Sequence, residues 1–184
     1  MTYIILDRDG VINYDSDQYI KSPDEWHPIP GSLEAIATLN RHGFRVLVAT
    51  NQSGVARGLY DISVLNQIHE KLVQALAAVG GHVEEIFFCP HHPEDHCACR
   101  KPKPGLIHQI QAKYPVDLVG TFFIGDSYAD MEAARSSGCK PLLVLTGNGR
   151  LTLEKYPAFS TIPNFKDLAE AVNYVISHQG VHGE

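Results

Sequence analysis

The sequence contains no apolar run that approaches the length of a membrane-spanning helix. The N-terminus has no basic segment followed by a long apolar one, so we expect no secretory signal and place the protein in the cytoplasm, away from membranes. Internal repeats and low-complexity stretches are absent. An excess of basic residues is also absent, because the formal net charge is −6, and this argues against a general nucleic-acid binder.

The composition that is present is that of a globular protein. Hydrophobic residues make up 44% and charged residues 20% of the 184 residues. A chain of this length is large enough to bury a core as one unit. We therefore predict a single domain over residues 1–184.

Short apolar runs alternate along the chain with segments whose apolar residues repeat every three or four positions. The predicted strands are 3–6, 44–49, 83–88, 121–124 and 141–145. The predicted helices are 31–41, 62–79, 106–113, 127–137 and 166–177. The longer irregular stretches are 10–30, 51–60, 89–104 and 146–164. This alternation predicts an α/β fold, a doubly wound, mostly parallel sheet with helices on both faces.

Polar residues follow the predicted strands at the end where parallel sheets bind ligands. The first strand runs into Asp7 and Asp9, the second into Thr50, the third into Cys89 and the fourth into Asp126. Side chains two residues apart on extended backbone point the same way. Two carboxylates so close repel each other unless a cation or a proton lies between them. With Asp126 as a third oxygen donor, the pattern favours Mg²⁺, whereas the alternative is that Asp7 and Asp9 only cap a turn.

A second cluster of metal-binding residue types lies in a short loop at residues 89–99. The ligand set Cys-x-His-x5-Cys-x-Cys comprises Cys89, His91, Cys97 and Cys99. Three thiolates and an imidazole fit a closed, structural Zn²⁺ site, and cysteines without a secretion signal favour metal over disulfides. His92 and His96 are rival ligands, and reduced, unligated thiols are the alternative. Cys139 stands apart and is expected to be a small buried residue.

The ordered motifs Asp7-Arg8-Asp9-Gly10, Thr50, Lys101 and Gly125-Asp126 resemble those of the haloacid dehalogenase-like (HAD) superfamily of phosphatases. The longer stretches DRDGVIN, TNQSGVARGLY, CPHHP with CACRKPKPG, and IGDSYADMEAA are similar to the heptose bisphosphate phosphatase family within it. The related histidinol-phosphate phosphatases share much of this pattern, including the zinc loop. The resemblance covers nearly the whole chain and selects His91 over its rivals.

The resemblance implies a Mg²⁺-dependent phosphatase that works through an aspartyl-phosphate. Asp7 would be the nucleophile and Asp9 the general acid and base. Mg²⁺ would be held by Asp7, the backbone carbonyl of Asp9, and Asp126. Thr50 and Lys101 would bind the phosphoryl oxygens. The substrate would be a heptose bisphosphate used to make nucleotide-activated heptose for lipopolysaccharide or other surface glycans.

Further residues are expected at the substrate on the same basis: Gly10, Asn51, Gln52, Ser53, Arg57, Arg100 and Ser127. Many heptose phosphatases carry a lysine where this chain has Ser127, which puts a cationic contact from that position in doubt. Lys101 is chosen over Lys103 because KPKPG matches the family pattern KPxPG. Lys103 and Arg8 are expected to be solvated cations, and Arg150 a surface residue or a distant substrate contact.

No gap between the predicted elements is long enough for an inserted cap domain, so we expect a capless, monomeric enzyme that acts on a small phosphorylated sugar. Three alternatives stay open. A histidinol-phosphate phosphatase would use acidic residues near the mouth of the site, namely Asp15, Asp17, Asp24 and Glu25. A receiver-type phosphoacceptor domain would share Asp, Thr, Lys and Mg²⁺, but an acid/base at Asp9 argues against it. A nucleic-acid end phosphatase fits poorly with the acidic charge.

Overall fold

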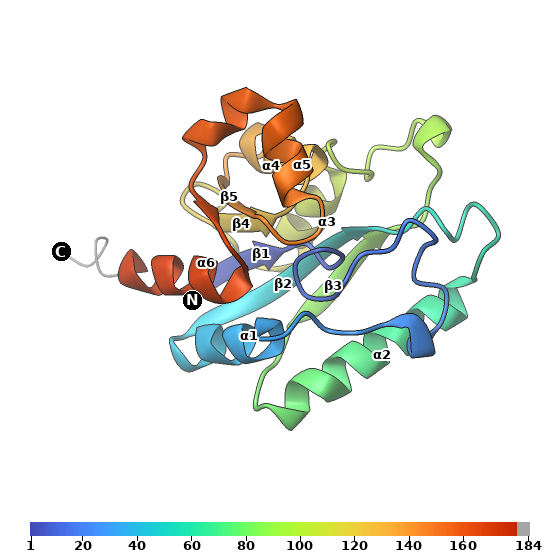
Figure 1. Ribbon diagram of the computed structural model, residues 1–184, viewed down its shortest axis with the longest axis horizontal. Coiled ribbons are helices and arrows are strands. Elements are labelled where there is room, and N and C mark those ends of the chain that lie inside the picture. The colour runs from blue at the N-terminus through green and yellow to red at the C-terminus, as the bar shows by residue number, and fades with distance from the viewer. Residues whose placement is uncertain (180–184) are drawn as a thin grey trace.

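A parallel sheet forms the centre of the fold (Figure 1). The computed structural model describes residues 1–179, so 180–184, the end of the predicted domain, lie outside the described part. Within residues 1–179 the sheet has six strands in the order β3-β2-β1-β4-β5-β6, and every neighbouring pair is parallel. The strands are β1 (Thr2–Leu6), β2 (Phe44–Asn51), β3 (Glu85–Cys89), β4 (Phe122–Gly125), β5 (Lys140–Val144) and β6 (Asn164–Phe165).

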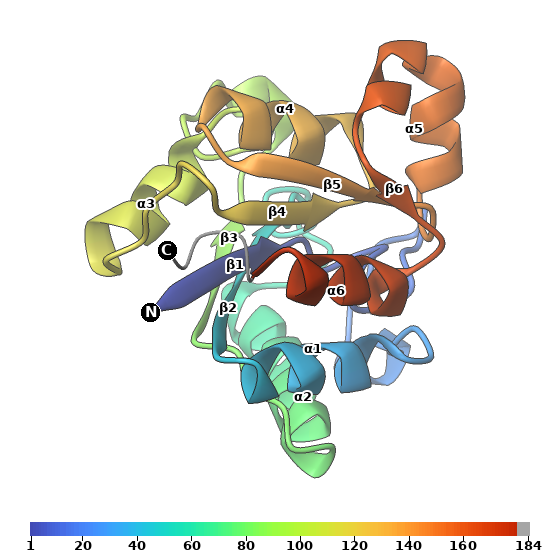
Figure 2. The same ribbon diagram turned by 90° about the vertical axis from the view of Figure 1, so that its left-hand side faces the viewer.

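Helices cover both faces of this sheet (Figure 2). They are α1 (Ser32–Arg41), α2 (Ile62–Ala78), α3 (Gly105–Lys113), α4 (Tyr128–Ser136), α5 (Gly149–Lys155) and α6 (Leu168–Ser177). Short 3-10 helices occur at Pro23–Glu25, Pro93–Asp95 and Pro157–Thr161. The predicted doubly wound α/β fold is confirmed.

Strand β1 supplies both faces of the core. Ile4 and Leu6 pack in one apolar cluster with residues of α1, α2 and α6, whereas Tyr3 and Ile5 pack in another with residues of α3 and α4. Successive side chains of a strand point to opposite faces, so a strand in the middle of a covered sheet is apolar throughout. This burial on both sides explains why the run ends abruptly where the polar residues begin.

The strand order changes direction between β1 and β4. The chain first winds outward from β1 through β2 to β3, and it then returns to place β4 on the other side of β1. In the register, Leu6 lies beside Val48 of β2 and Ile124 of β4. Ligands of such sheets bind at this reversal, beyond the carboxyl ends of the strands.

Two elements lie inside the stretch 146–164, which the sequence predicted to be irregular. Helix α5 has seven residues, and β6 has two residues that pair with Leu143 and Val144 of β5. Elements this short carry too few repeats to show a period.

The segments 10–30 and 52–60 are loops, apart from the 3-10 helix Pro23–Glu25, and no inserted cap domain interrupts residues 1–179. The helices of this described part are also each too short or too polar to cross a membrane.

Candidate active site

An open cavity lies at the carboxyl end of the sheet and has a volume of about 480 Å³. Its walls come from the ends of β1, β2 and β4 and from the loops that follow β1 to β5. The lining residues are Asp7, Asp9, Asp15, Ser16, Asp17, Tyr19, Ile20, Thr50, Asn51, Gln52, Ser53, Arg57, Arg100, Lys101, Asp126, Ser127, Ala129 and Asn148. Every residue predicted for catalysis, substrate or Mg²⁺ is among them except Gly10.

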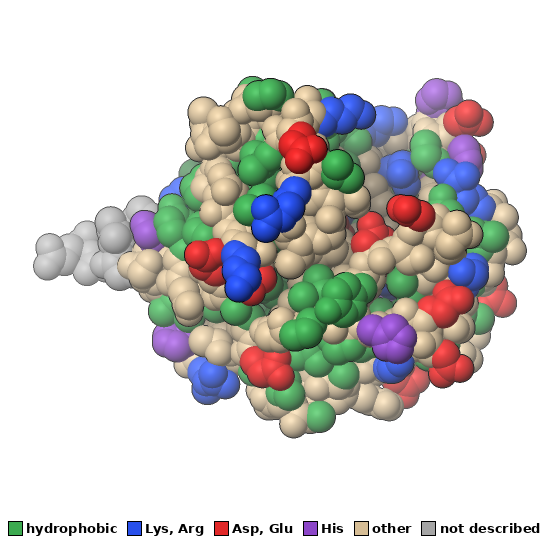
Figure 3. Space-filling view, viewed as in Figure 1, with side chains coloured by type: hydrophobic (Ala, Val, Ile, Leu, Met, Phe, Trp, Pro, Cys, Tyr) green, Lys and Arg blue, Asp and Glu red, His purple; other side chains and the backbone are tan. Residues whose placement is uncertain are grey.

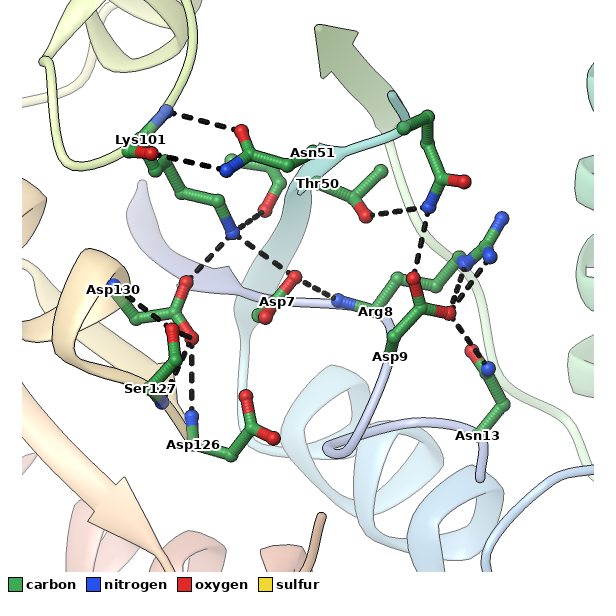
Figure 4. Close-up of polar contacts among 12 residues, drawn as sticks. Asp7, Arg8, Asp9, Asn13, Thr50, Asn51, Lys101, Asp126, Ser127 and Asp130 are labelled. Carbon is green, nitrogen blue, oxygen red and sulfur yellow. Dashed lines mark hydrogen bonds and ion pairs between the residues drawn. The ribbon is translucent and has the colours of Figure 1, made fainter. Parts of the chain in front are cut away.

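Asp7 follows β1 directly and is 8% exposed. Its backbone N–H donates to Ile124 O of β4 at 3.0 Å, which continues the pairing of the two strands. Its Oδ1 accepts from the backbone N–H of Arg8 at 2.7 Å and lies 3.0 Å from Lys101 Nζ. Burial and the nearby carboxylates raise the pKa of Asp7 well above its usual range. The side chain is thus fixed in place next to one cation (Figure 4).

Lys101 is a buried ammonium group with three acceptors. Its Nζ donates to Asp130 Oδ1 at 2.6 Å, to Asp7 Oδ1 at 3.0 Å and to Ala49 O at 2.7 Å. Burial works against the charge, but Asp130 and Asp7 raise the pKa of Lys101 overall, so it is cationic at neutral pH. The rival Lys103 is exposed and donates to Cys97 O, as expected for a solvated cation.

Asn51, at the end of β2, holds the Lys101 backbone. Its Nδ2 donates to Lys101 O at 3.1 Å, and its Oδ1 accepts from Lys101 N at 3.0 Å. The amide is therefore used to position Lys101, and a substrate contact from Asn51 stays a prediction. Thr50 beside it is fully buried, and its Oγ1 accepts from Gln52 Nε2 at 2.9 Å.

Asp130 is a central residue that was not predicted as a site residue. It is fully buried one turn into α4, and its Oδ2 accepts from the backbone N–H of Asp126 and from Ser127 Oγ. The Ser127 hydroxyl in turn accepts from Asp130 N in a capping box. Ser127-x-x-Asp130 at the start of a helix was the available signal for this arrangement.

Asp126 approaches Asp7 from β4. Burial and Asp130 raise its pKa well above the usual range, although its Oδ2 accepts from Asn148 N at 2.8 Å. Gly10 allows this approach: it has φ of +82°, and a Cβ there would collide with the Asp126 carboxylate. Gly10 therefore lies behind Asp126 rather than on the cavity wall, which differs from its predicted contact with substrate.

Asp9 points away from Asp7 (Figure 4). Its Oδ1 accepts from Arg8 Nε at 2.9 Å, Arg8 Nη2 at 2.7 Å and Asn13 Nδ2 at 2.9 Å, while its Oδ2 accepts from Gln52 Nε2 at 3.0 Å. Burial acts to raise the pKa of Asp9, but Arg8 and the hydrogen bonds hold it below the usual range. The expectation that Arg8 is solvated is wrong, because its side chain is fully buried against Asp9.

Carboxylate oxygens of Asp7, Asp126 and Asp130 lie within 4.8 Å of one another. All three residues are buried, and the raised pKa values of Asp7 and Asp126 mean that further positive charge would stabilise their ionised forms. Hard oxygen donors with an open side toward a cavity fit Mg²⁺. The Asp9 side chain is not in this cluster, so a role for Asp9 in holding the metal stays with its backbone carbonyl, as predicted.

The four predicted zinc ligands also converge. The Sγ atoms of Cys89 and Cys99 lie 2.9 Å apart, and His91 Nδ1 lies 3.4 Å from Cys89 Sγ and 3.2 Å from Cys99 Sγ. Cys97 Sγ completes the group at 3.6 Å from Cys89 Sγ. Burial raises the pKa of Cys89 to about 12, so a cation is needed to hold this thiol as a thiolate at neutral pH. The donor set and its convergence fit a tetrahedral Zn²⁺.

Two arginines line the cavity, namely Arg57 and Arg100. Arg100 lies next to Lys101, and its Nη1 is buried without a hydrogen-bond partner within residues 1–179. Arg57 is exposed, donates from Nε to Ser53 Oγ at 3.3 Å and lies over the ring of Tyr19. Arg150 is exposed and does not line the cavity.

Two of the four acidic residues considered for a cationic substrate line the cavity, namely Asp15 and Asp17. Asp15 accepts from Asn148 Nδ2 at 3.1 Å across the mouth. Asp24 and Glu25 lie in the 3-10 helix away from the cavity. The cavity lining thus contains both basic and acidic groups.

The chain is similar to several known proteins. Residues 98–171 match the family described as HAD-hyrolase-like. The D-glycero-beta-D-manno-heptose-1,7-bisphosphate 7-phosphatase of Bordetella bronchiseptica is 58% identical over 153 residues, which cover 83% of this chain and 86% of that protein. The enzyme of the same name from Pseudomonas aeruginosa is 54% identical over 173 residues, 94% of this chain and 97% of that protein. A crystal structure of D,D-heptose 1,7-bisphosphate phosphatase from B. bronchiseptica, complexed with magnesium and phosphate, matches with a TM-score of 0.93 at 52% identity and covers 96% of this chain and 99% of that chain.

Proposed function

Because the chain belongs to the D-glycero-β-D-manno-heptose-1,7-bisphosphate 7-phosphatase family, we propose that it hydrolyses this bisphosphate at its 7-phosphate and releases the heptose 1-phosphate and inorganic phosphate. The observation that carries the proposal is the buried cluster of Asp7, Lys101 and Asp126 at the strand reversal. We place the reaction in the synthesis of nucleotide-activated heptose.

Asp7 is the nucleophile in this proposal. One Asp7 oxygen forms a bond to phosphorus while the bond from phosphorus to the sugar oxygen breaks, and the electron pair of that bond goes to the sugar oxygen. Asp9 is ionised in the free site, and the negative charge of the bound phosphate would raise its pKa so that it carries a proton in the complex. The sugar oxygen takes this proton from Asp9, and an aspartyl-phosphate is left on Asp7. The contacts of Asp7 with Lys101 and with the Arg8 backbone support this role, because they fix the attacking side chain.

Positive charge around the transferred group supplies most of the remaining catalysis. Lys101 and the Thr50 hydroxyl bind phosphoryl oxygens in the proposal. Asp7, the backbone carbonyl of Asp9, and Asp126 would hold Mg²⁺, which would supply further positive charge for the same oxygens.

In the second half of the reaction Asp9 accepts a proton from water. The water oxygen bonds to phosphorus, the bond between phosphorus and Asp7 breaks, and inorganic phosphate leaves with Asp7 and Asp9 restored. The open cavity supports entry of water at this stage, because loops rather than a cap domain surround it.

The 1-phosphate of the substrate would lie toward Arg100 and Arg57. The unpartnered, buried Nη1 of Arg100 supports an anionic ligand there. Ser53 and Gln52 would complete the substrate-binding wall.

The cysteine and histidine cluster is proposed to hold one structural Zn²⁺. Its loop leads directly into Arg100 and Lys101, so an ordered metal site would fix both cations against the phosphates. We further propose that the protein acts as a cytoplasmic monomer.

Histidinol phosphate is the second candidate substrate. Asp15 and Asp17 on the cavity wall favour it, since they could meet a cationic group of the substrate.

The test is kcat/KM for both anomers of the heptose bisphosphate and for histidinol phosphate under one Mg²⁺ concentration. We expect the β anomer of the bisphosphate to give the highest value, with histidinol phosphate far poorer. If histidinol phosphate equals or exceeds both anomers, the heptose assignment is wrong and the second candidate replaces it.

A further inference from the structure

Arg8 is a fully buried guanidinium group behind the proposed acid/base. Its Nε and Nη2 both donate to Oδ1 of Asp9, at 2.9 and 2.7 Å. A charge taken out of water is retained only when it is paired and hydrogen-bonded, and Asp9 is the anion that pairs with it. The guanidinium therefore holds one oxygen of Asp9 in a fixed place.

The third corner of the guanidinium is held by His69 of α2. Arg8 Nη1 lies 3.1 Å from His69 Nε2, and the imidazole is buried. Burial, followed by the charge of Arg8, lowers the pKa of His69 to about 3, so the ring is neutral and its Nε2 accepts the hydrogen bond. His69 lies outside the cavity lining and reaches Asp9 through Arg8.

The other Asp9 oxygen is fixed from the opposite side. Gln52 Nε2 donates to Asp9 Oδ2, and Gln52 Oε1 accepts from Tyr60 Oη at 2.7 Å. In Figure 4 the Asp9 carboxylate consequently points toward Arg8 and Asn13, away from Asp7. An in-line displacement places the leaving oxygen across phosphorus from the nucleophile, so an acid that serves that oxygen must stand off from Asp7.

We propose that Arg8, braced by His69, is a positioning residue that holds the Asp9 carboxylate on the leaving-group side of the site. This inference rests on the proposed phosphatase function. Neither Arg8 nor His69 contacts the transferred group. They set the position of the Asp9 carboxyl group. That position determines how well Asp9 protonates the sugar oxygen as its bond to phosphorus breaks.

The dependence of kcat/KM on the leaving group distinguishes a positioning role from a purely structural one. A sugar oxygen needs the proton of Asp9 as its bond to phosphorus breaks. p-Nitrophenolate is a stable anion and leaves without a proton. Because kcat/KM reports the steps up to release of the leaving group, misplacement of Asp9 should lower kcat/KM for the heptose bisphosphate and spare that for p-nitrophenyl phosphate.

The test compares His69→Leu, which removes the acceptor, with His69→Gln, which retains one. For His69→Leu we expect kcat/KM on the heptose bisphosphate to fall by about tenfold or more, a part of the hundredfold or larger effect of general acid catalysis, and kcat/KM on p-nitrophenyl phosphate to stay within about twofold. His69→Gln should restore most of the loss. Arg8→Lys, which keeps the buried cation but loses the paired donors, should show the same selective loss and serves if His69→Leu does not fold.

Lys71→Met is the matched control. Lys71 lies on the same helix and donates to Pro23 O and Trp26 O, without contact to Asp9. Its replacement should change kcat/KM by the same factor for both substrates. Equal losses on the two substrates in folded His69→Leu and Arg8→Lys, or no loss in either, would overturn the positioning role. A parent enzyme that turns over neither substrate would instead overturn the proposed function.

Discussion

Lys101 decides the charge balance of the site. Three buried carboxylates stand within reach of one another, and the ammonium group lies between two of them, 3.0 Å from Asp7 and 2.6 Å from Asp130. Lys101 Nζ lies nearer to Asp130 than to Asp7, and its charge holds the pKa of Asp130 below the usual range despite burial. The pKa values of Asp7 and Asp126 stay raised, so these two carboxylates would be stabilised by a divalent cation, and that cation would in turn attract the anionic phosphoryl group.

Replacing Asp9 by Asn should trap the phosphoenzyme when p-nitrophenyl phosphate is the substrate, because its leaving group departs without a proton from Asp9. The amide cannot take a proton from water, so turnover slows while the phosphoryl group stays on Asp7 and is detected as added mass by intact-protein mass spectrometry. The same change leaves Arg8 buried without its anion, at a cost of about 3–5 kcal/mol in the free energy of unfolding. An Asp9→Asn protein as active as the parent would contradict the acid/base assignment.

The buried His69 should make the protein sensitive to acid. Its folded-state pKa of about 3 lies below the ordinary histidine pKa of 6.5, so between these values the unfolded chain binds a proton that the folded one does not. Stability is therefore complete above about pH 6.5 and declines below it, by roughly 1.4 kcal/mol per pH unit from this residue. Urea unfolding at several pH values should show a steeper decline for the parent than for His69→Gln, and parallel curves would contradict the buried, neutral ring.

The main residues of the candidate site could be predicted one by one, but their network could not. Asp7, Lys101 and Asp126 were found because their types and order match a known pattern. Arg8 was misjudged as solvated, because a charged side chain between two acidic residues in a loop gives no local sign of burial. Its partner His69 is 61 residues away on α2, and such a contact exists only once the sheet has formed.

At the scale of elements, long strands and helices were predictable and short ones were not. Helix α2 repeats its apolar face over 17 residues, whereas β6 consists of two residues and depends on pairing with β5. Helix α5 matters for the site nonetheless, since Asn148 at its start donates to Asp126. Asp130 was missed for a related reason: its carboxylate gains importance from Lys101, which arrives from another loop.

The loop 89–99 should contain one zinc ion per chain by elemental analysis of protein purified without chelator. Cys97→Ala should lose the zinc and much of the stability, because the loop has few apolar residues of its own. Cys97 suits the test because it is less buried than Cys89 and Cys99, so removing it disturbs packing least. Cys139→Ala, a buried cysteine outside the cluster, should keep its zinc, and a zinc-free parent would contradict the proposed metal site.

At the scale of the whole molecule, the strand reversal between β1 and β4 brings the carboxylates together. Asp7 and Asp126 are 119 positions apart in the sequence, yet they follow neighbouring strands. The sequence predicted a doubly wound parallel sheet but not the order of its strands. The rule that such sheets bind ligands at a strand reversal was the only guide to the position of the site. On the face drawn in Figure 3, acidic and basic side chains are interspersed, and the cavity lining likewise contains both.

The bisphosphate preference should depend on Arg100. A charge-assisted contact with phosphate is worth roughly 1.5–3 kcal/mol, so Arg100→Ala should reduce the preference for the heptose bisphosphate over a sugar monophosphate by about tenfold to a hundredfold in kcat/KM. Arg150→Ala is the control, because Arg150 is exposed and lies off the cavity. If the preference is unchanged in Arg100→Ala, the second phosphate does not bind at Arg100.

The most direct test of the account follows the phosphoryl group itself. The parent enzyme is mixed with D-glycero-β-D-manno-heptose 1,7-bisphosphate and Mg²⁺ and quenched in acid within one turnover. Peptide mass spectrometry then locates the phosphoryl group on the protein, and phosphorus NMR identifies the sugar product. We predict a phosphoryl group on Asp7 and heptose 1-phosphate in solution, with neither formed by Asp7→Asn. A phosphoryl group on another residue, or heptose 7-phosphate as the product, would contradict the account.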